Sequence, residues 1–321
     1  MRHLRLVPDV TSIDFMRYTR FWLIVSLVGV IGSIGLLATR GLNLGVDFRG
    51  GTLIMAATPE EQPLSVWRDV LGDVGVGEVG VTEISDDTGQ GRHMVLIRLG
   101  TADMEEGAAP AVDATRAALS QAFPEVQILQ VDSVGGKVSG ELVRAGFLAV
   151  LLSFLGIMVY IWLRFEWQFA IGAVLSLIHD AIVTVGVFSL LQLEFNLTIV
   201  AAVLTVVGYS INDTVVVFDR MRENLRKYKK MPLKEVMNLA LNETLSRTIM
   251  TSLTTLIALF AIYWFSGPVV HGFAFAVIFG VLTGTYSSIY VAGATVLWLG
   301  VKRDWSKPDA SAGTQFGGAK A

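Results

Sequence analysis

Charged and titratable residues inside long apolar runs carry the strongest chemical signal in this sequence. Asp213 lies within the apolar run 197–218, and His179 and Asp180 lie within the run 169–191. A charged side chain at the centre of a bilayer costs about 3 kcal/mol on insertion scales, so each such residue is a functional candidate. Carboxylates and imidazoles at that depth indicate proton transfer inside a membrane.

A basic residue and a set of hydroxyl groups accompany Asp213. Arg247 opens the run 248–265 in "LSRTIM", at the membrane face where the run carrying Asp213 ends. An ion pair between Asp213 and Arg247 would lower the desolvation cost of both charges. Polar side chains at three- and four-residue steps could hold water between two helices, as a proton relay requires. Besides His179 and Asp180, the relay candidates are Ser210, Asn212, Thr214, Thr248, Thr251 and Ser252.

Two other readings of these residues stay open from the sequence. The Asp213–Arg247 pair could serve only to set the register of two helices. Asp180 and Asp213 could instead form the acid pair of an intramembrane aspartyl protease. Against the protease, the estimated depths of the two aspartates differ by several ångström, and no glycine stands immediately before Asp213 to open the backbone.

The elements that must position these residues are membrane helices. The chain has 321 residues, of which 53% are hydrophobic, and its mean hydropathy is +0.58. Apolar runs of this kind predict a polytopic α-helical membrane protein with six transmembrane helices. The first run is followed by Arg40 and has no cleavage site, so we expect it to remain as an anchor. The predicted spans are Phe21–Ala38, Ala145–Leu163, Phe169–Leu191, Leu197–Phe218, Thr248–Phe265 and Phe273–Leu299.

Lysine and arginine residues predict the orientation. They gather in 1–20, at Arg164, between the fourth and fifth spans, and after the sixth span, whereas the connections "QLEFN" and "SGPVVHG" have none. By the positive-inside rule both termini and a basic loop, 219–244, are cytoplasmic. The tail 301–321 is expected to be disordered. Segment 39–140 then lies outside the cytoplasm.

This large segment has its own pattern of strands and helices. The order is strand, helix, strand, strand, helix, strand, which predicts a ferredoxin-like α+β domain (βαββαβ) between the first and second spans. The fold supports many functions, so it assigns none by itself. His93 has no histidine or carboxylate at metal-ligand spacing and the chain has no cysteine, so no metal site is expected. The elements are Thr52–Thr58, Pro63–Asp73, Val79–Asp86, His93–Leu99, Ala109–Phe123 and Val126–Val134.

Four long blocks resemble a known family. They are "GLNLGVDFRGGT", "RFEWQFAIGAVLSLIHD", "EFNLTIVAAVLTVVGYSINDTVVVFDRMREN" and "LSRTIMTSLTTL". In this order they are similar to the signature blocks of the SecF family of bacterial protein-export membrane proteins, in the resistance-nodulation-division superfamily. The resemblance covers essentially the whole chain.

The resemblance implies an export function. It implies a six-span partner, SecD, and association in the bacterial inner membrane with the SecYEG translocon and the accessory proteins YajC and YidC. Unfolded secretory proteins are the implied substrates, and the proton-motive force, or alternatively a sodium gradient, is the implied energy source. No cofactor, nucleic acid or catalysed reaction is implied. Carried over by motif, Asp213 and Arg247 belong to the proton path.

The remaining motif residues have structural interpretations. Asp47, Gly50 and Gly51 are expected to anchor a turn between the first span and the domain, since glycine adopts backbone conformations that other residues resist. The charged residues Asp219, Arg220 and Arg222 are expected to set topology and interlock with neighbouring cytoplasmic segments. A passive assembly subunit and a small-molecule exporter remain alternatives, although six spans with one domain fit an exporter poorly.

Overall fold

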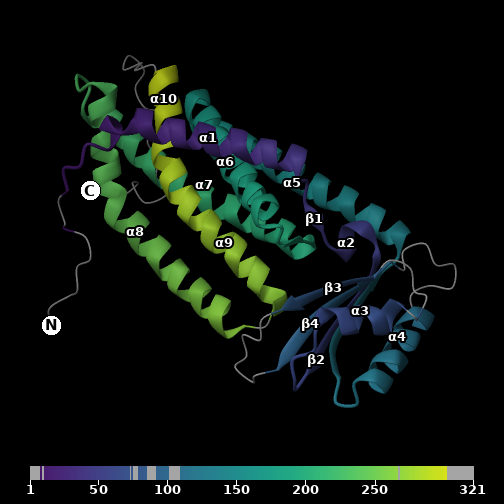
Figure 1. Ribbon diagram of the computed structural model, residues 1–321. Helices are drawn as coiled ribbons and strands as arrows, with labels where there is room; N and C mark the ends of the chain where they lie inside the picture. The colour runs from purple at the N-terminus through teal and green to yellow at the C-terminus, as the bar shows by residue number, and fades with distance from the viewer. Residues whose placement is uncertain are drawn as a thin grey trace, which may run out of the picture.

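Six long helices form the membrane part of the molecule. The computed structural model describes residues 8, 11–72, 74, 79–84, 92–100, 109–266 and 268–301 (Figure 1). Within them, six helical segments are long and apolar enough to cross a membrane, which confirms the predicted fold class. The tail predicted to be disordered, 301–321, lies outside the described residues except for residue 301. The helices are α1 (Thr19–Thr39), α5 (Gly136–Arg164), α6 (Trp167–Leu191), α7 (Leu197–Lys227), α8 (Leu233–Phe265), and the sixth, made of α9 (Pro268–Ser287), a π-helix (Ser288–Ala292) and α10 (Gly293–Leu299).

The connection between α7 and α8 differs from the prediction. Both helices continue through the charged residues, and only residues 228–232 join them. The predicted loop at 219–244 was therefore wrong, because most of this segment is helical. Arginine, lysine and glutamate are good helix formers, so a change from apolar to charged residues marks a membrane surface without ending a helix.

The predicted ferredoxin-like domain is confirmed. Its strands pair antiparallel in the order β3-β4-β2-β5. Helices α3 and α4 cover one face of the sheet, where Trp67, Leu71 and Leu119 pack against Ile54 and Ile97. The strand residues of this core, Ile54 and Ala56 on β2 and Val95, Ile97 and Leu99 on β4, occur at every second position, because alternate side chains of a strand point to the same face. The elements are β2 (Gly51–Thr58), α3 (Leu64–Gly72), β3 (Val79–Ile84), β4 (His93–Leu99), α4 (Ala109–Ala122) and β5 (Gln127–Val134).

The other face of the sheet is turned toward the membrane helices, so that the sheet lies between them and α3 and α4 (Figure 1). Leu53, Met55 and Arg98 on this face line a cleft of about 960 Å³. The opposite wall includes Tyr263 at the end of α8 and Phe275 in α9. The domain therefore stands on one end of the bundle, across a shared cleft.

A small joint that the sequence did not predict fastens the domain to the bundle. Strand β1 (Asn43–Leu44) pairs in parallel with β6 (Glu194–Phe195), which lies between α6 and α7. The short helix α2 (Val46–Arg49) follows β1 and ends at Gly50, whose φ is 72°; φ at Gly51 is 119°. Only glycine adopts these values readily, which accounts for both glycines of the motif.

Candidate proton site in the membrane bundle

Asp213 is buried between three helical segments. It lies on α7 with 7% of its surface exposed. Thr248 Oγ1 on α8 donates a hydrogen bond to Asp213 Oδ1 at 2.6 Å, and Ser288 Oγ, at the start of the π-helix, donates to Oδ2 at 2.8 Å. Each carboxylate oxygen thus has one hydroxyl donor. The arrangement can stabilise the ionised carboxylate, and the same hydroxyls can accept from the protonated acid.

The predicted ion pair between Asp213 and Arg247 is not formed, so that prediction was wrong. Arg247 is exposed, and no ion pair involves it within the described part of the chain. The reason is helical geometry, because consecutive residues of an α-helix point about 100° apart. Since Thr248 faces Asp213, the neighbouring Arg247 points to the outside of α8.

A second carboxylate, Asp180, is fully buried on α6. Its Oδ2 atom accepts hydrogen bonds from Ser210 Oγ on α7 at 2.6 Å and from Ser287 Oγ on α9 at 2.8 Å. His179 Nδ1 lies 2.9 Å from Oδ1, and His179 Nε2 lies 2.9 Å from the hydroxyl of Tyr286. The structure therefore builds a polar network around Asp180 from three helices.

The predicted relay residues divide into two groups. Ser210 and Thr248 bind the carboxylates directly, as described above, and Ser252 forms a hydrogen bond with Thr285 and accepts one from Tyr209. The buried Thr214 donates to the backbone oxygen of Ser210. The structure does not bring the other two into this network. Asn212 is exposed next to the inward-facing Asp213, and the exposed Thr251 donates only to backbone oxygens of its own helix.

Three site residues were not among the predicted candidates. Tyr286, Ser287 and Ser288 belong to the run "TGTYSSIY" in the sixth span, whose small residues by themselves indicate close helix packing. The π-helix Ser288–Ala292 begins within this run. Such π-helical insertions occur frequently at functional sites. The hydroxyl groups in the last span were the available signal, and sequence alone did not show that they face Asp180 and Asp213.

The two buried aspartates do not form an acid pair. No hydrogen bond joins their carboxylates, and each of the four oxygen atoms contacts another polar group. Aspartic proteases need two carboxylates that share one proton. The geometry therefore does not support the intramembrane protease.

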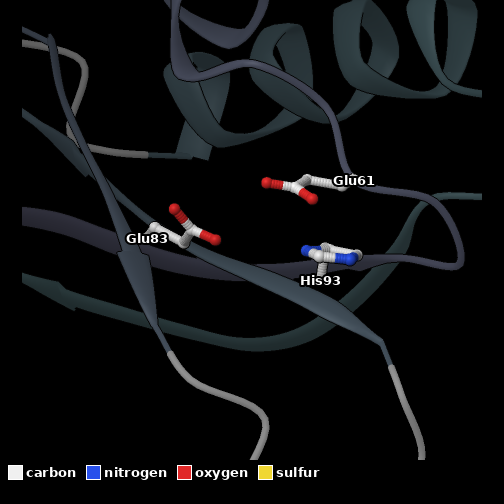
Figure 2. Close-up of side chains that lie close together, drawn as sticks. All are labelled: Glu61, Glu83 and His93. Carbon is white, nitrogen blue, oxygen red and sulfur yellow. The ribbon is translucent and has the colours of Figure 1, made fainter.

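His93 has carboxylate neighbours that sequence spacing concealed. Glu61, in the loop after β2, and Glu83, on β3, lie close to His93 (Figure 2), and one ligand atom from each of the three residues lies within 4.8 Å of the others. These nitrogen and oxygen atoms could contact a divalent cation. Both glutamates are exposed, however, and exposed acidic groups often lie together without an ion. We therefore do not treat the group as a metal centre.

Charged residues in the C-terminal part of α7 connect this helix to two other helices. Arg164 of α5 forms an ion pair with Asp219 at 3.0 Å, and Arg222 donates to the backbone oxygen of Arg164 at 3.3 Å. Arg220 pairs with Glu243 of α8 at 2.8 Å. The motif thus holds α5, α7 and α8 together at this end.

Comparisons with known proteins agree in one assignment. Residues 114–302 match the family model of the protein export membrane protein SecD/SecF, C-terminal, and residues 35–54 match the SecD/SecF GG motif. The chain is similar to a solved structure of SecDF, described as a translocon-associated membrane protein from Thermus thermophilus, with 33% identity and a TM-score of 0.80. That match covers 90% of this chain and 39% of the SecDF chain, so this chain spans well under half of SecDF.

Curated relatives match along nearly their full length. The chain is 50% identical to a protein translocase subunit SecF from Cereibacter sphaeroides, with 98% of this chain and 97% of the relative covered. It is 48% identical to the SecF subunit of Ketogulonicigenium vulgare, over 98% and 97% of the two chains. With six membrane helices, an export-family model over more than half of its length and these relatives, the chain belongs to the SecF family of protein translocase subunits.

Proposed function

We propose that this chain, with SecD, uses the proton-motive force to drive a late step of Sec-dependent export across the inner membrane, and that Asp213 carries the proton. The observation behind the proposal is the burial of Asp213 between two hydroxyl donors without an ion pair. A buried carboxylate without a paired cation is most directly stabilised by binding a proton. Because hydroxyls both donate and accept, loading and release need only small rotations.

The change of charge supplies the coupling. Protonation removes a negative charge from the contact between α7, α8 and the π-helix, so it alters the balance of forces among these segments. One charge that crosses a potential of 100 mV is worth about 2.3 kcal/mol, enough to bias two helix arrangements. Movement of α7 would reach the sheet domain through the joint at β1 and β6. Export would follow from this conformational change, without a covalent reaction catalysed by the chain.

Exposed small, polar and charged residues on the outer face of α7 and α8 support the proposal that a partner protein covers this face in the membrane. Residues Thr198, Ala201, Thr205, Gly208 and Asn212 recur at three- and four-residue steps on α7, and all are exposed. Lipid-facing positions are normally large and apolar, whereas small and polar residues favour contact between helices. Arg247, exposed on the adjacent α8, is costly in lipid. We infer that SecD covers this face, that an acidic group of SecD pairs with Arg247, and that Arg247 enters the proton path there.

The proposal includes an orientation and a wider assembly. Both chain termini and the basic end of α7 face the cytoplasm, and the ferredoxin-like domain is periplasmic, in keeping with the lysine and arginine distribution. The SecYEG translocon, YajC and YidC are the proposed neighbours, and unfolded secretory chains are the proposed substrates. Of the coupling ions, we favour the proton because Asp213 is bound by hydroxyl donors.

The test is release of a secreted protein from spheroplasts that contain SecD and equal amounts of wild type or Asp213→Asn. We expect the gradient to accelerate release in the wild type and to have no effect in Asp213→Asn. Thr283→Val is a matched control, since within the described residues the Thr283 hydroxyl donates only to the backbone oxygens of Phe279 and Gly280 of its own helix. If Asp213→Asn responds to the gradient like the wild type, the chain is a passive assembly subunit. If collapse of a sodium gradient alone stops release, the coupling ion is sodium.

A further inference from the structure

The network around Asp180 is a second buried titratable centre that the Asp213 step does not use. Asp180 has no exposed surface, and His179 is 4% exposed. Asp180 contacts His179, Ser210 and Ser287, and His179 contacts Tyr286. Among the described residues, Tyr286 is the one titratable side chain outside the pair that forms a hydrogen bond with it. A fully buried carboxylate with a histidine as its neighbour is expensive unless the pair can bind a proton.

The pair has two hydrogen-bonded forms that differ by one proton. In the first, neutral His179 donates from Nδ1 to Asp180 Oδ1 and accepts at Nε2 from the hydroxyl of Tyr286. In the second, Nε2 has gained a proton and donates to the Tyr286 oxygen, whose hydrogen rotates away. The first form has a net charge of −1 and the second is neutral. An imidazole ring can carry one or two protons, so the ring keeps both hydrogen-bond contacts in either form.

The helices place this pair beside Asp213. Ser210 donates to Asp180 and stands three residues before Asp213 on α7, which is about 4.5 Å of helix rise. Ser287 donates to Asp180, and the next residue, Ser288, donates to Asp213. Consecutive hydroxyls at the α9–π-helix junction therefore contact the two carboxylates separately. Helix α7 begins at Leu197, on the side of the sheet domain, and Ser210 comes before Asp213 along it. Because Ser210 contacts Asp180, Asp180 lies closer than Asp213 to the sheet domain.

A glycine permits this close arrangement. A Cβ atom added to Gly284 on α9 would lie 3.2 Å from the Cβ of Ser210 and 3.6 Å from Oδ2 of Asp180. A Cβ here would be tight against Ser210, which would have to move by a few tenths of an ångström, and would be in ordinary contact with Asp180. Ser176 adds to the network by donating to Ser287 at 2.9 Å. The contact of three helices at Asp180 thus depends on small and hydroxyl-bearing residues on α6, α7 and α9.

We propose that His179, Asp180 and Tyr286 form a second proton-binding site, in series with Asp213 and on its domain side. The proposal rests on the proton coupling of the proposed function. A proton from the domain side binds His179 Nε2; it then leaves the pair and protonates the Asp213 carboxylate, restoring neutral His179. Only N–H and O–H bonds form and break. Ser210, Ser287 and Ser288 hold the two sites next to each other.

The first experiment measures gradient-driven release with Asp180→Asn and His179→Gln in the SecD complex. Thr184→Val is the control, because Thr184 is buried one turn away on α6 and its hydroxyl has no hydrogen-bond partner in the described structure. We expect both variants to lose the gradient-driven component and keep the gradient-independent one, at wild-type membrane abundance. If both respond to the gradient like Thr184→Val while Asp213→Asn does not, the second site is refuted and the proposed function stands.

The second experiment separates proton binding from a merely structural role. In the complex in lipid bilayers, ¹⁵N-histidine solid-state NMR follows the four histidines of the chain over a pH series, and His179→Gln identifies the signals of His179. We expect the His179 ring to change protonation in this series and Asp180→Asn to shift that change. A His179 ring that keeps one protonation state at every pH would overturn the second site, even if the variants impair export. If Asp213→Asn keeps the gradient response, the proposed function fails and the series arrangement fails with it.

Discussion

The Oδ2 atom of Asp47 accepts a hydrogen bond from the backbone N–H of Leu197 at 2.9 Å, across 150 residues of sequence. Leu197 is the first residue of α7, and the first N–H groups of a helix have no partner within it. Asn196 caps the N–H of Ile199 locally. Asp47 thus completes the cap and ties the helix that carries Asp213 to the segment leading into the sheet domain.

Removal of this cap should loosen the joint. We expect Asp47→Ala to lower the free energy of unfolding by about 1 kcal/mol, the usual value of a helix cap, and Asp47→Asn to lower it less because its amide oxygen still accepts. Thermal unfolding of the purified protein in detergent measures both. Asp113→Ala, at an exposed position of α4, is the control. Equal unfolding midpoints for Asp47→Ala and this control would mean that the bond contributes nothing.

Close contact of α7 and α9 depends on Gly280. A Cβ atom at this position would overlap the side chain of Val206. Overpacking of a filled interior typically costs about 1–3 kcal/mol, so Gly280→Ala should lower the unfolding midpoint, and Val206→Ala in the same chain should restore part of it. Gly156→Ala is the control, since nothing lies within 4 Å of a Cβ there. A Gly280→Ala protein as stable as this control would contradict the packing.

Thr248 should matter more than other buried threonines of the bundle. Thr248→Val removes the donor to Asp213 Oδ1, and a hydrogen bond to a charged group contributes about 1.5–3 kcal/mol. We expect weaker gradient-driven release with Thr248→Val and recovery with Thr248→Ser. The spheroplast assay measures both variants against Thr283→Val. Loss of release in Thr283→Val as well would show a general packing effect.

Glu194 should make the joint sensitive to pH. Burial raises the pKa of Glu194 above its ordinary value of 4.5, with Arg98 opposing the shift and Asp47 adding to it. A carboxyl whose pKa is raised in the folded state contributes stability that is complete below the unfolded pKa and is lost as pH rises through the folded pKa. We therefore expect stability to fall from pH 4.5 upward, and Glu194→Gln to flatten this part of the curve. Thermal unfolding at a series of pH values tests this prediction. If the unfolding midpoints of the wild type and Glu194→Gln change with pH in parallel, Glu194 is excluded as the cause.

The orientation can be tested with single cysteines, because the natural chain contains none. Asp113→Cys lies in the sheet domain and Lys230→Cys in the connection between α7 and α8, and both positions are exposed. With an impermeant maleimide on spheroplasts, we expect labelling of Asp113→Cys at once and of Lys230→Cys only after permeabilisation. The reverse pattern would invert the proposed topology.

The sequence alone determined the elements and most of their order. Apolar runs of membrane length predict α1 and α5 to α9 because lipid leaves few alternatives to a helix. Alternating strands with turn residues predict the domain, where β4 occupies His93–Leu99 as expected. Asp213, Asp180 and His179 stood out because charge is rare at that depth.

Only the tertiary structure decided which of these side chains meet. Consecutive residues of α8 point in different directions, so Thr248 binds Asp213 while Arg247 points outward. The residue types alone do not show which of these two neighbours faces inward. Ser287, the last residue of α9, and Ser288, the first residue of the π-helix, donate to different carboxylates, and the sequence did not show which carboxylate each serine contacts. Strands of two residues, such as β1 and β6, have too few side chains to form a pattern, so their pairing depends on the packing of segments far apart in the chain.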